Sequence, residues 1–126
     1  DDVAGYNRLV NFVRSGSLAD DGLYDLAGSL TLVPVAFPVD APIDPDEYVN
    51  VVLTRSQQGR LRGYVDGVQQ FDYPANAGDP DGIISAQNIL RFFRDNADRQ
   101  ESSGAVARIR LYDQAMTFQQ VVLLGP

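Results

Sequence analysis

Residues 60–73 read RLRGYVDGVQQFDY and contain the strongest local folding signal in the chain. Two runs rich in β-forming residues, 60–65 and 68–73, flank the dipeptide Asp66-Gly67. A two-residue type I′ turn needs positive φ at both central positions, which Asp-Gly tolerates, and its twist matches that of paired strands. We therefore predict an antiparallel β-hairpin over residues 60–73.

The same kind of signal continues on both sides of this hairpin. Short apolar runs bounded by Gly, Pro, Asp and Asn recur, which is typical of an all-β protein. The further strands that this pattern predicts cover residues 8–14, 22–26, 29–35, 48–55, 88–94 and 104–112. A short helix is expected at residues 118–124, because Thr117 can cap it and apolar side chains recur there at helical spacing. The predicted fold is an antiparallel two-sheet β-sandwich of jelly-roll type with one short C-terminal helix.

Composition narrows the classes of function. The length of 126 residues and the apolar content of 44% suit a single globular domain. The chain has no Cys and no His, which excludes disulfides, zinc–thiolate sites and Ser-His-Asp or Cys-His catalysis. A net charge of −7 argues against a nucleic-acid partner, because phosphates need a basic field. No apolar run reaches the roughly 18 residues of a membrane span, so membrane insertion is not expected.

The order of motifs after residue 48 is more specific than any one of them. YVNVVLTR (48–55), GYVDG (63–67), LRFFRD (90–95) and ARIRLYD (107–113) follow one another. This order resembles the laminin-G-like domains of the concanavalin A-like lectin/glucanase superfamily, over about residues 6–124. The resemblance implies one such domain over residues 1–126, usually with further strands before the first of these residues. Without those strands, residues 104–112 would present an open edge, which favours an oligomer or a larger parent chain.

The superfamily includes glucanases, so glycoside hydrolysis has to be considered. That reaction needs two carboxylates about 5–10 Å apart. Enzymes of the superfamily place theirs in a Glu-x-Asp-x-x-Glu-like run, which this sequence lacks. Glu47 and Glu101 stand in predicted polar loops, and Asp44 and Asp46 flank a proline. We expect a domain that is not an enzyme, with a degenerate glycosidase as the least favoured alternative.

Aspartate-rich loops suggest calcium as a ligand, because Ca²⁺ takes oxygen donors from carboxylates and carbonyls. The candidate ligands are Asp21 and Asp95, with Asp20, Asn96 and Asp98 beside them. The resemblance supports this choice, since many laminin-G-like domains hold one ion at the rim. The alternative is that these residues only shape turns.

Tyr64, Arg108 and Arg110 are the candidate ligand-binding residues. A tyrosine can form a platform for a sugar, and arginines that alternate along a strand can bind carboxylates or sulfates. The alternative packs the tyrosine in the sandwich and pairs the arginines with acids across strands.

We expect a non-catalytic binding or adhesion module that recognises glycan or protein, with calcium as a possible aid. The resemblance places it in a secreted or cell-surface bacterial protein. A structural module that packs against other domains or subunits, without a free ligand, is the alternative.

Overall fold

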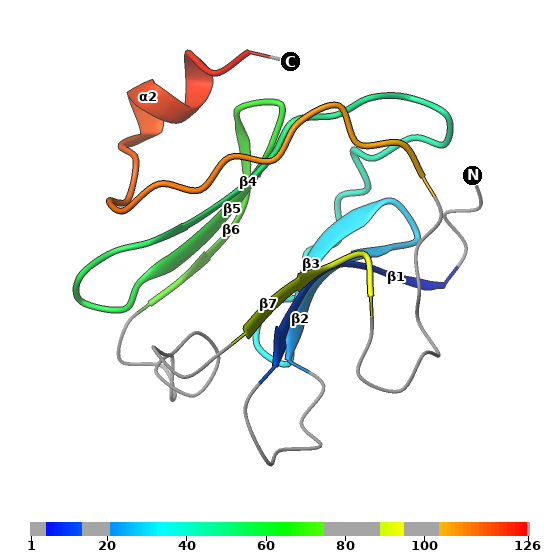
Figure 1. Cartoon of the computed structure of the whole chain (residues 1–126), viewed down its shortest axis with the longest axis horizontal. Coiled ribbons are helices and arrows are strands. Elements are labelled where there is room, and N and C mark those ends of the chain that lie inside the picture. Colours follow the sequence, from blue (N-terminus) through cyan, green and yellow to red (C-terminus); the bar gives the residue numbers. More distant parts are fainter. Residues whose placement is uncertain (1–4, 14–20, 75–88, 95–103, 126) are drawn as a thin grey trace.

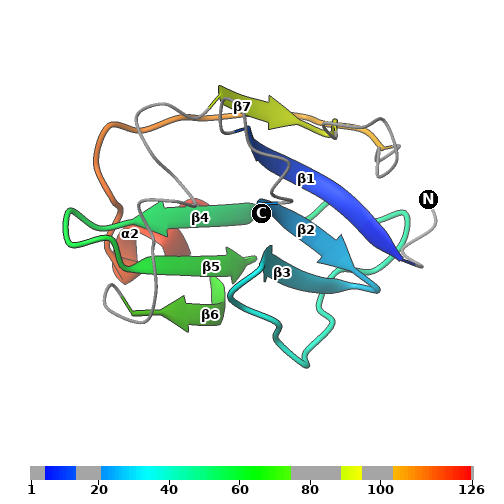
Figure 2. The ribbon, with the colours of Figure 1, turned by 90° about the horizontal axis from the view of Figure 1, so that it is seen from below.

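The computed structural model describes residues 5–13, 21–74, 89–94 and 104–125. Within these residues, two antiparallel sheets pack face to face (Figures 1 and 2). The four-stranded sheet has the order β3-β2-β1-β7, and the three-stranded sheet has the order β4-β5-β6. The elements are β1 (Tyr6–Val13), β2 (Gly22–Leu26), β3 (Ser29–Val33), β4 (Val51–Arg55), β5 (Leu61–Val65), β6 (Val68–Tyr73), β7 (Ile89–Phe92) and the helix α2 (Phe118–Val122). The predicted β-sandwich with a short C-terminal helix is confirmed.

The predicted Asp66-Gly67 hairpin is also confirmed. Asp66 has φ 47° and Gly67 has φ 78°, as a type I′ turn requires, and Val65 pairs with Val68 across it. The Asp66 carboxylate accepts a hydrogen bond from the Asn50 amide at 2.8 Å, and the Asp66 amide donates to the Asn50 carbonyl at 2.9 Å. These two bonds tie the turn to the residue just before β4.

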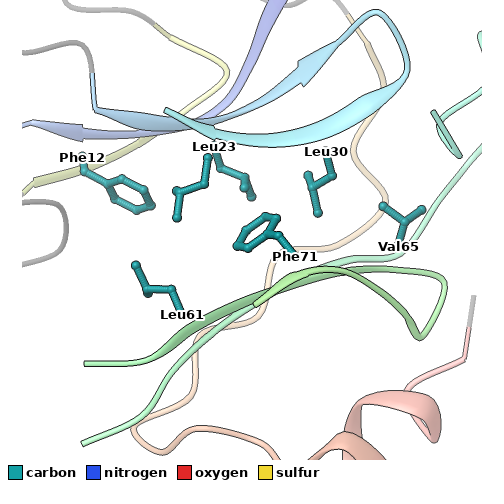
Figure 3. Close-up of a cluster of buried hydrophobic side chains, with 7 residues drawn as sticks. Phe12, Leu23, Leu30, Leu61, Val65 and Phe71 are labelled. Atoms are coloured by element: carbon teal, nitrogen blue, oxygen red, sulfur yellow. The ribbon is translucent and has the colours of Figure 1, made fainter. Parts of the chain in front are cut away.

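A cluster of buried apolar side chains lies between the two sheets. Its buried members come from both sheets: Phe12, Leu23, Leu30 and Leu32 from one, and Leu61, Val65 and Phe71 from the other (Figure 3). Phe71 is paired with Gly63 and lays its ring over it, so that a Cβ atom at Gly63 would lie only 2.2 Å from the ring. The missing side chain of Gly63 is therefore what lets Phe71 fill the centre of the core.

Predicted and observed strand bounds differ by one to three residues at several ends, and one predicted strand is absent. β4 begins at Val51 instead of Tyr48, and β3 ends at Val33, because the next residue is Pro34, which has no amide to donate to a ladder. The strand predicted over residues 104–112 is wrong, since this segment carries no strand and all nine of its residues are exposed. Its alternating sequence can form a strand only beside a backbone that offers hydrogen bonds, and no described backbone does so.

The β2–β3 turn yields a prediction about stability. Ala27 is exposed and has φ 51°, a left-handed conformation that costs an L-residue roughly 1–2 kcal/mol, whereas Asn tolerates it well. Ala27→Asn should therefore raise the free energy of unfolding in urea by about 1 kcal/mol. Ala115→Asn, at another exposed alanine but with ordinary φ, is the matched control and should give no gain. Equal effects of the two substitutions would contradict this account of the turn.

Candidate functional site

The helix α2 covers the face of the three-stranded sheet that points away from the core (Figures 1 and 3). Thr117 begins it with a capping box, in which the Thr117 and Gln120 side chains each bond the other's backbone amide. Val121 is fully buried, and the ring of Phe118 lies 6.4 Å from that of Tyr64. At the far end, the Asn50 side chain donates to the Gly125 carbonyl at 2.8 Å. The helix is thus fixed to the sheet at both ends.

This packing buries Tyr64, one of the predicted ligand-binding residues. Tyr64 is only 1% exposed, because the helix covers it. Its neighbour on the same face, Arg62, stays half-buried. Tyr64 therefore holds α2 on the sheet and is not presented to a ligand.

Residues 104–112, here called the closing segment, run as an extended chain to α2 past the β4 side of the three-stranded sheet (Figures 1 and 2). No backbone hydrogen bond joins this segment to any other described residue. Together with α2 and the residue after it, the closing segment carries half of the exposed large hydrophobic side chains in the described part of the chain. They are Val106, Ile109, Leu111, Tyr112, Phe118, Val122 and Leu123, and we call them the C-terminal surface. Leu111 is 73% exposed and Leu123 is 84% exposed, the highest values among these seven residues.

The predicted ligand-binding residues Arg108 and Arg110 lie in the middle of the closing segment. Both side chains are exposed, and neither makes a hydrogen bond or an ion pair within the described residues. The alternative expectation, that acids on a neighbouring strand pair with them, is therefore not met in the described structure. Two free guanidinium groups stand among apolar side chains on a domain of net charge −7.

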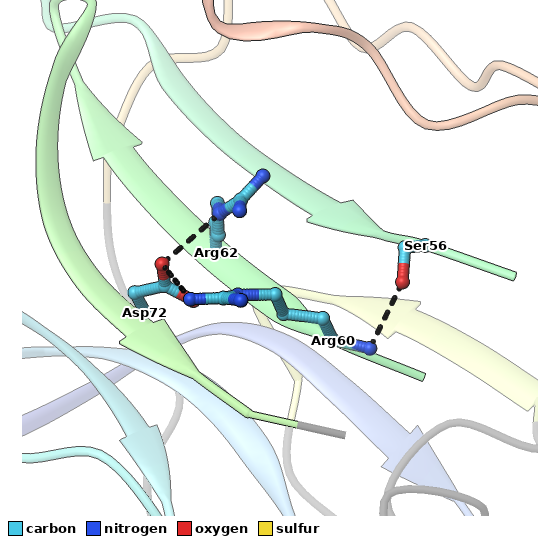
Figure 4. Close-up of polar contacts among 4 residues, drawn as sticks. All are labelled: Ser56, Arg60, Arg62 and Asp72. Atoms are coloured by element: carbon cyan, nitrogen blue, oxygen red, sulfur yellow. Dashed lines mark hydrogen bonds and ion pairs between the residues drawn. The ribbon is translucent and has the colours of Figure 1, made fainter. Parts of the chain in front are cut away.

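A contrasting arginine pair lies on β5 and just before it. Arg60 contacts Asp72 through two nitrogens, at 2.5 Å and 2.7 Å, and Arg62 Nε lies 3.2 Å from the same carboxylate (Figure 4). The hydrogen bond from Arg60 is the main reason why the pKa of Asp72 is lowered from its usual value of 3.8. Both arginines have a bonded acid, so the network stabilises the β5–β6 hairpin.

The Asp72 network predicts a pH dependence of stability. Because the folded pKa of Asp72 lies below its unfolded value near 3.8, the stabilisation is complete above that value and is lost as pH falls through the lowered folded pKa. Asp72→Asn should therefore lower the melting temperature by a few degrees at pH 6 and by progressively less below pH 4. Asp113→Asn, at an exposed acid with no ion pair among the described residues, is the control. A deficit of Asp72→Asn that is the same at pH 6 and pH 2.5 would rule out the ion pair as its cause.

A second aromatic and cationic cluster lies on the four-stranded sheet, and the sequence analysis did not identify it. The Arg8 guanidinium lies 4.5 Å from the centre of the Tyr24 ring and also donates to its hydroxyl group, while Tyr6 meets Tyr24 edge-on at 5.7 Å. Such clusters can bind sugars, but Arg8 and Tyr24 are both fully buried. Only the pairing of Arg8 with Tyr24 between β1 and β2 reveals this cluster, because nothing in either strand's sequence marks it.

Of the predicted calcium ligands, the structure describes Asp21 alone. Asp21 directly precedes β2, and its carbonyl accepts a hydrogen bond from the Phe12 amide at 3.1 Å. Asp95, Asp20, Asn96 and Asp98 lie outside the described residues. Among the described residues, no three carboxylates come together as a metal site. One carboxylate alone does not form a calcium site, so calcium binding stays a prediction.

The fold is a two-sheet β-sandwich, and half of the exposed large hydrophobic side chains among its described residues lie between Val106 and Leu123. Residues 15–122 match the family model of the concanavalin A-like lectin/glucanases superfamily, and the chain belongs to this family. No curated protein and no solved structure matches the chain. None of the helices in the described part is long and apolar enough to cross a membrane.

Proposed function

We propose that this domain is a non-catalytic binding module that recognises another polypeptide through its C-terminal surface. The observation that carries the proposal is the exposure of leucine, isoleucine and aromatic side chains around two unpaired arginines. Isolated apolar side chains are normal on protein surfaces, whereas a group of them in one segment suggests an interaction site. Arginine and aromatic residues are also enriched in protein–protein interfaces.

The chemistry of this surface favours a polypeptide over a glycan. A shallow sugar site needs an aromatic platform with polar groups beside it, and the buried Arg8–Tyr24 cluster does not offer an accessible one. Ile109, Leu111 and Leu123 instead present aliphatic groups, which gain most from contact with other apolar side chains. The sequence also predicted recognition of a glycan. The binding experiment described below distinguishes a glycan from a polypeptide.

The proposal that the domain is not catalytic is supported by three aspartates whose carboxylates have structural hydrogen-bond partners. Burial raises the pKa of Asp25, and its carboxylate accepts a hydrogen bond from the Gly28 amide at 2.7 Å in the β2–β3 turn. Asp66 binds the Asn50 amide, and Asp72 binds two arginines. Each of these carboxylates is used for structure, so none is free to act as an acid or a nucleophile.

A structural role is the second candidate function, because the same surface could be covered permanently by a neighbouring domain or subunit. The exposed apolar side chains of residues 104–112 support this alternative as well. We also propose, from the family alone, that the domain works in a secreted or cell-surface protein. Help from calcium stays a prediction of the sequence.

Selection from a random peptide library tests the proposed function. The purified domain should enrich peptides that lose about tenfold or more in affinity for the double variant Leu111→Ser/Leu123→Ser, because that variant removes the two most exposed apolar contacts. Val39→Ser is the matched control, since Val39 is 97% exposed but lies in the loop after β3. The same protein should give no signal on a glycan array.

Two results would contradict the proposal. Selected peptides that bind the double variant as well as the wild-type domain would place the binding site elsewhere. A glycan signal that depends on Arg108 and Arg110, without any peptide enrichment, would identify the partner as an anionic glycan.

A further inference from the structure

We propose that Arg60 and Arg62, on the outer face of the three-stranded sheet, bind a tetrahedral oxyanion, which is the sulfate or phosphate group of a small ligand. The anion would sit beside the Asp72 network and compensate the positive charge that this network leaves over. This site does not depend on the polypeptide binding proposed for the C-terminal surface.

The Asp72 network holds more positive than negative charge. Arg60 and Arg62 contact the Asp72 carboxylate at 2.5 Å and 3.2 Å, and neither forms an ion pair with another described acid. Two guanidinium groups therefore share one carboxylate, and one positive charge is left without a partner. Because the domain as a whole has a net charge of −7, this local excess marks a place where an anion is attracted instead of repelled.

The Arg62 guanidinium also has hydrogen-bond donors that are not used. It reaches Asp72 only through Nε, while its two terminal nitrogens point away from the carboxylate and bond no described residue (Figure 4). Arg60 uses Nε and one terminal nitrogen, so its other terminal nitrogen is unbonded within the described structure. Arginine binds phosphate oxygens well, because its planar fork can place two N–H groups on one anion. Arg62 can thus bind an oxyanion without releasing Asp72.

The sheet fixes the position of Arg62 and supplies a hydroxyl group beside it. β5 is the middle strand of its sheet, and Arg62 is directly paired with Thr54 on β4 and with Asp72 on β6. Thr54 is 7% exposed, and its hydroxyl bonds no described residue, so it can donate to an anion held by Arg62. Both edges of β5 are already paired, so a strand added at an edge of the sheet would leave these groups on the same face.

These donors suit a tetrahedral anion better than a carboxylate. Thr54, Arg60 and Arg62 occupy different positions on the face, so their donors approach one anion from different directions. Sulfate and phosphate offer oxygens in all directions, whereas the two oxygens of a carboxylate lie in one plane with its carbon. The group bound here is therefore expected to be a sulfate or a phosphate.

An NMR titration of the domain with sodium sulfate and with sodium phosphate tests the inference, with sodium chloride keeping the ionic strength constant. Both anions should shift the Nε–Hε signals of Arg60 and Arg62 with saturable binding, and sodium acetate should bind more weakly by about fivefold or more. Arg62→Gln should weaken sulfate binding about tenfold, because charge-assisted hydrogen bonds are lost. Arg91→Gln removes an exposed arginine from β7 in the other sheet and should change it less than about twofold, because salt screens a distant charge. Equal losses in the two variants, or acetate binding as tight as that of sulfate, would overturn the inference.

Asp72→Asn provides a second test with the opposite sign. This variant removes the carboxylate that competes for both arginines, so sulfate should bind about fivefold more tightly even though the variant melts at a lower temperature. Asp113→Asn changes the net charge by the same amount at an exposed acid and is the matched control. Sulfate binding by Asp72→Asn that is no tighter than that of Asp113→Asn would overturn the inference.

Phenyl phosphate distinguishes an organic ester from a free ion. Phe118 is 55% exposed and contacts Tyr64, which follows Arg62 by two residues on the same face, so an apolar group attached to the phosphate would lie toward this ring. Tighter binding of phenyl phosphate than of inorganic phosphate, lost in Phe118→Leu, would identify an ester, and equal binding would identify the free ion; both results support the site. The absence of saturable binding by sulfate and phosphate would overturn it and would leave peptide binding at the C-terminal surface unaffected.

Discussion

The architecture depends on the close approach of Phe71 to Gly63. Any side chain at Gly63 would occupy the space of the Phe71 ring, so the ring can lie flat in the core only because this residue has none. With that face of β5 and β6 turned toward β2 and β3, the alternate residues Arg62 and Tyr64 must face outward. The outer face then receives the Asp72 ion pairs and the helix α2. One steric requirement thus sets both the core and the layer that leads to the C-terminal surface.

Local signals in the sequence were sufficient wherever the structure is made by neighbouring residues. Asp66-Gly67 predicted its turn, residues 22–26 and 68–73 predicted β2 and β6, and Thr117 predicted the capped helix. The closing segment has an equally good strand pattern, yet it forms no strand, because pairing needs a second backbone that its own sequence does not describe. The burial of Tyr64 and the Arg8–Tyr24 contact likewise depend on which elements meet in space.

The same distinction governs the functional site. Membership of a superfamily that contains both lectins and glucanases fixes the fold and not the activity. Evidence for a site comes from the exposed groups. Among these, two pairs of arginines differ in whether they have a bonded acid. Arg60 and Arg62 share Asp72 as a bonded acid, whereas Arg108 and Arg110 have no bonded acid among the described residues and lie among exposed apolar side chains. In the closing segment, a backbone and two arginines without partners among the described residues coincide with the exposed Leu111, and the proposal that a partner binds there rests on this coincidence.

Hydrogen exchange of the isolated domain tests most directly whether the closing segment is unpaired. Amides that no hydrogen bond protects exchange at rates close to those of an unfolded peptide, whereas central strands are slowed by the stability of the whole domain. We predict exchange within about tenfold of the unfolded rate for residues 105–112, and slowing by several orders of magnitude for β2 and β5. Protection of residues 105–112 equal to that of β5 would show that the segment is already paired within this chain, and would contradict the account.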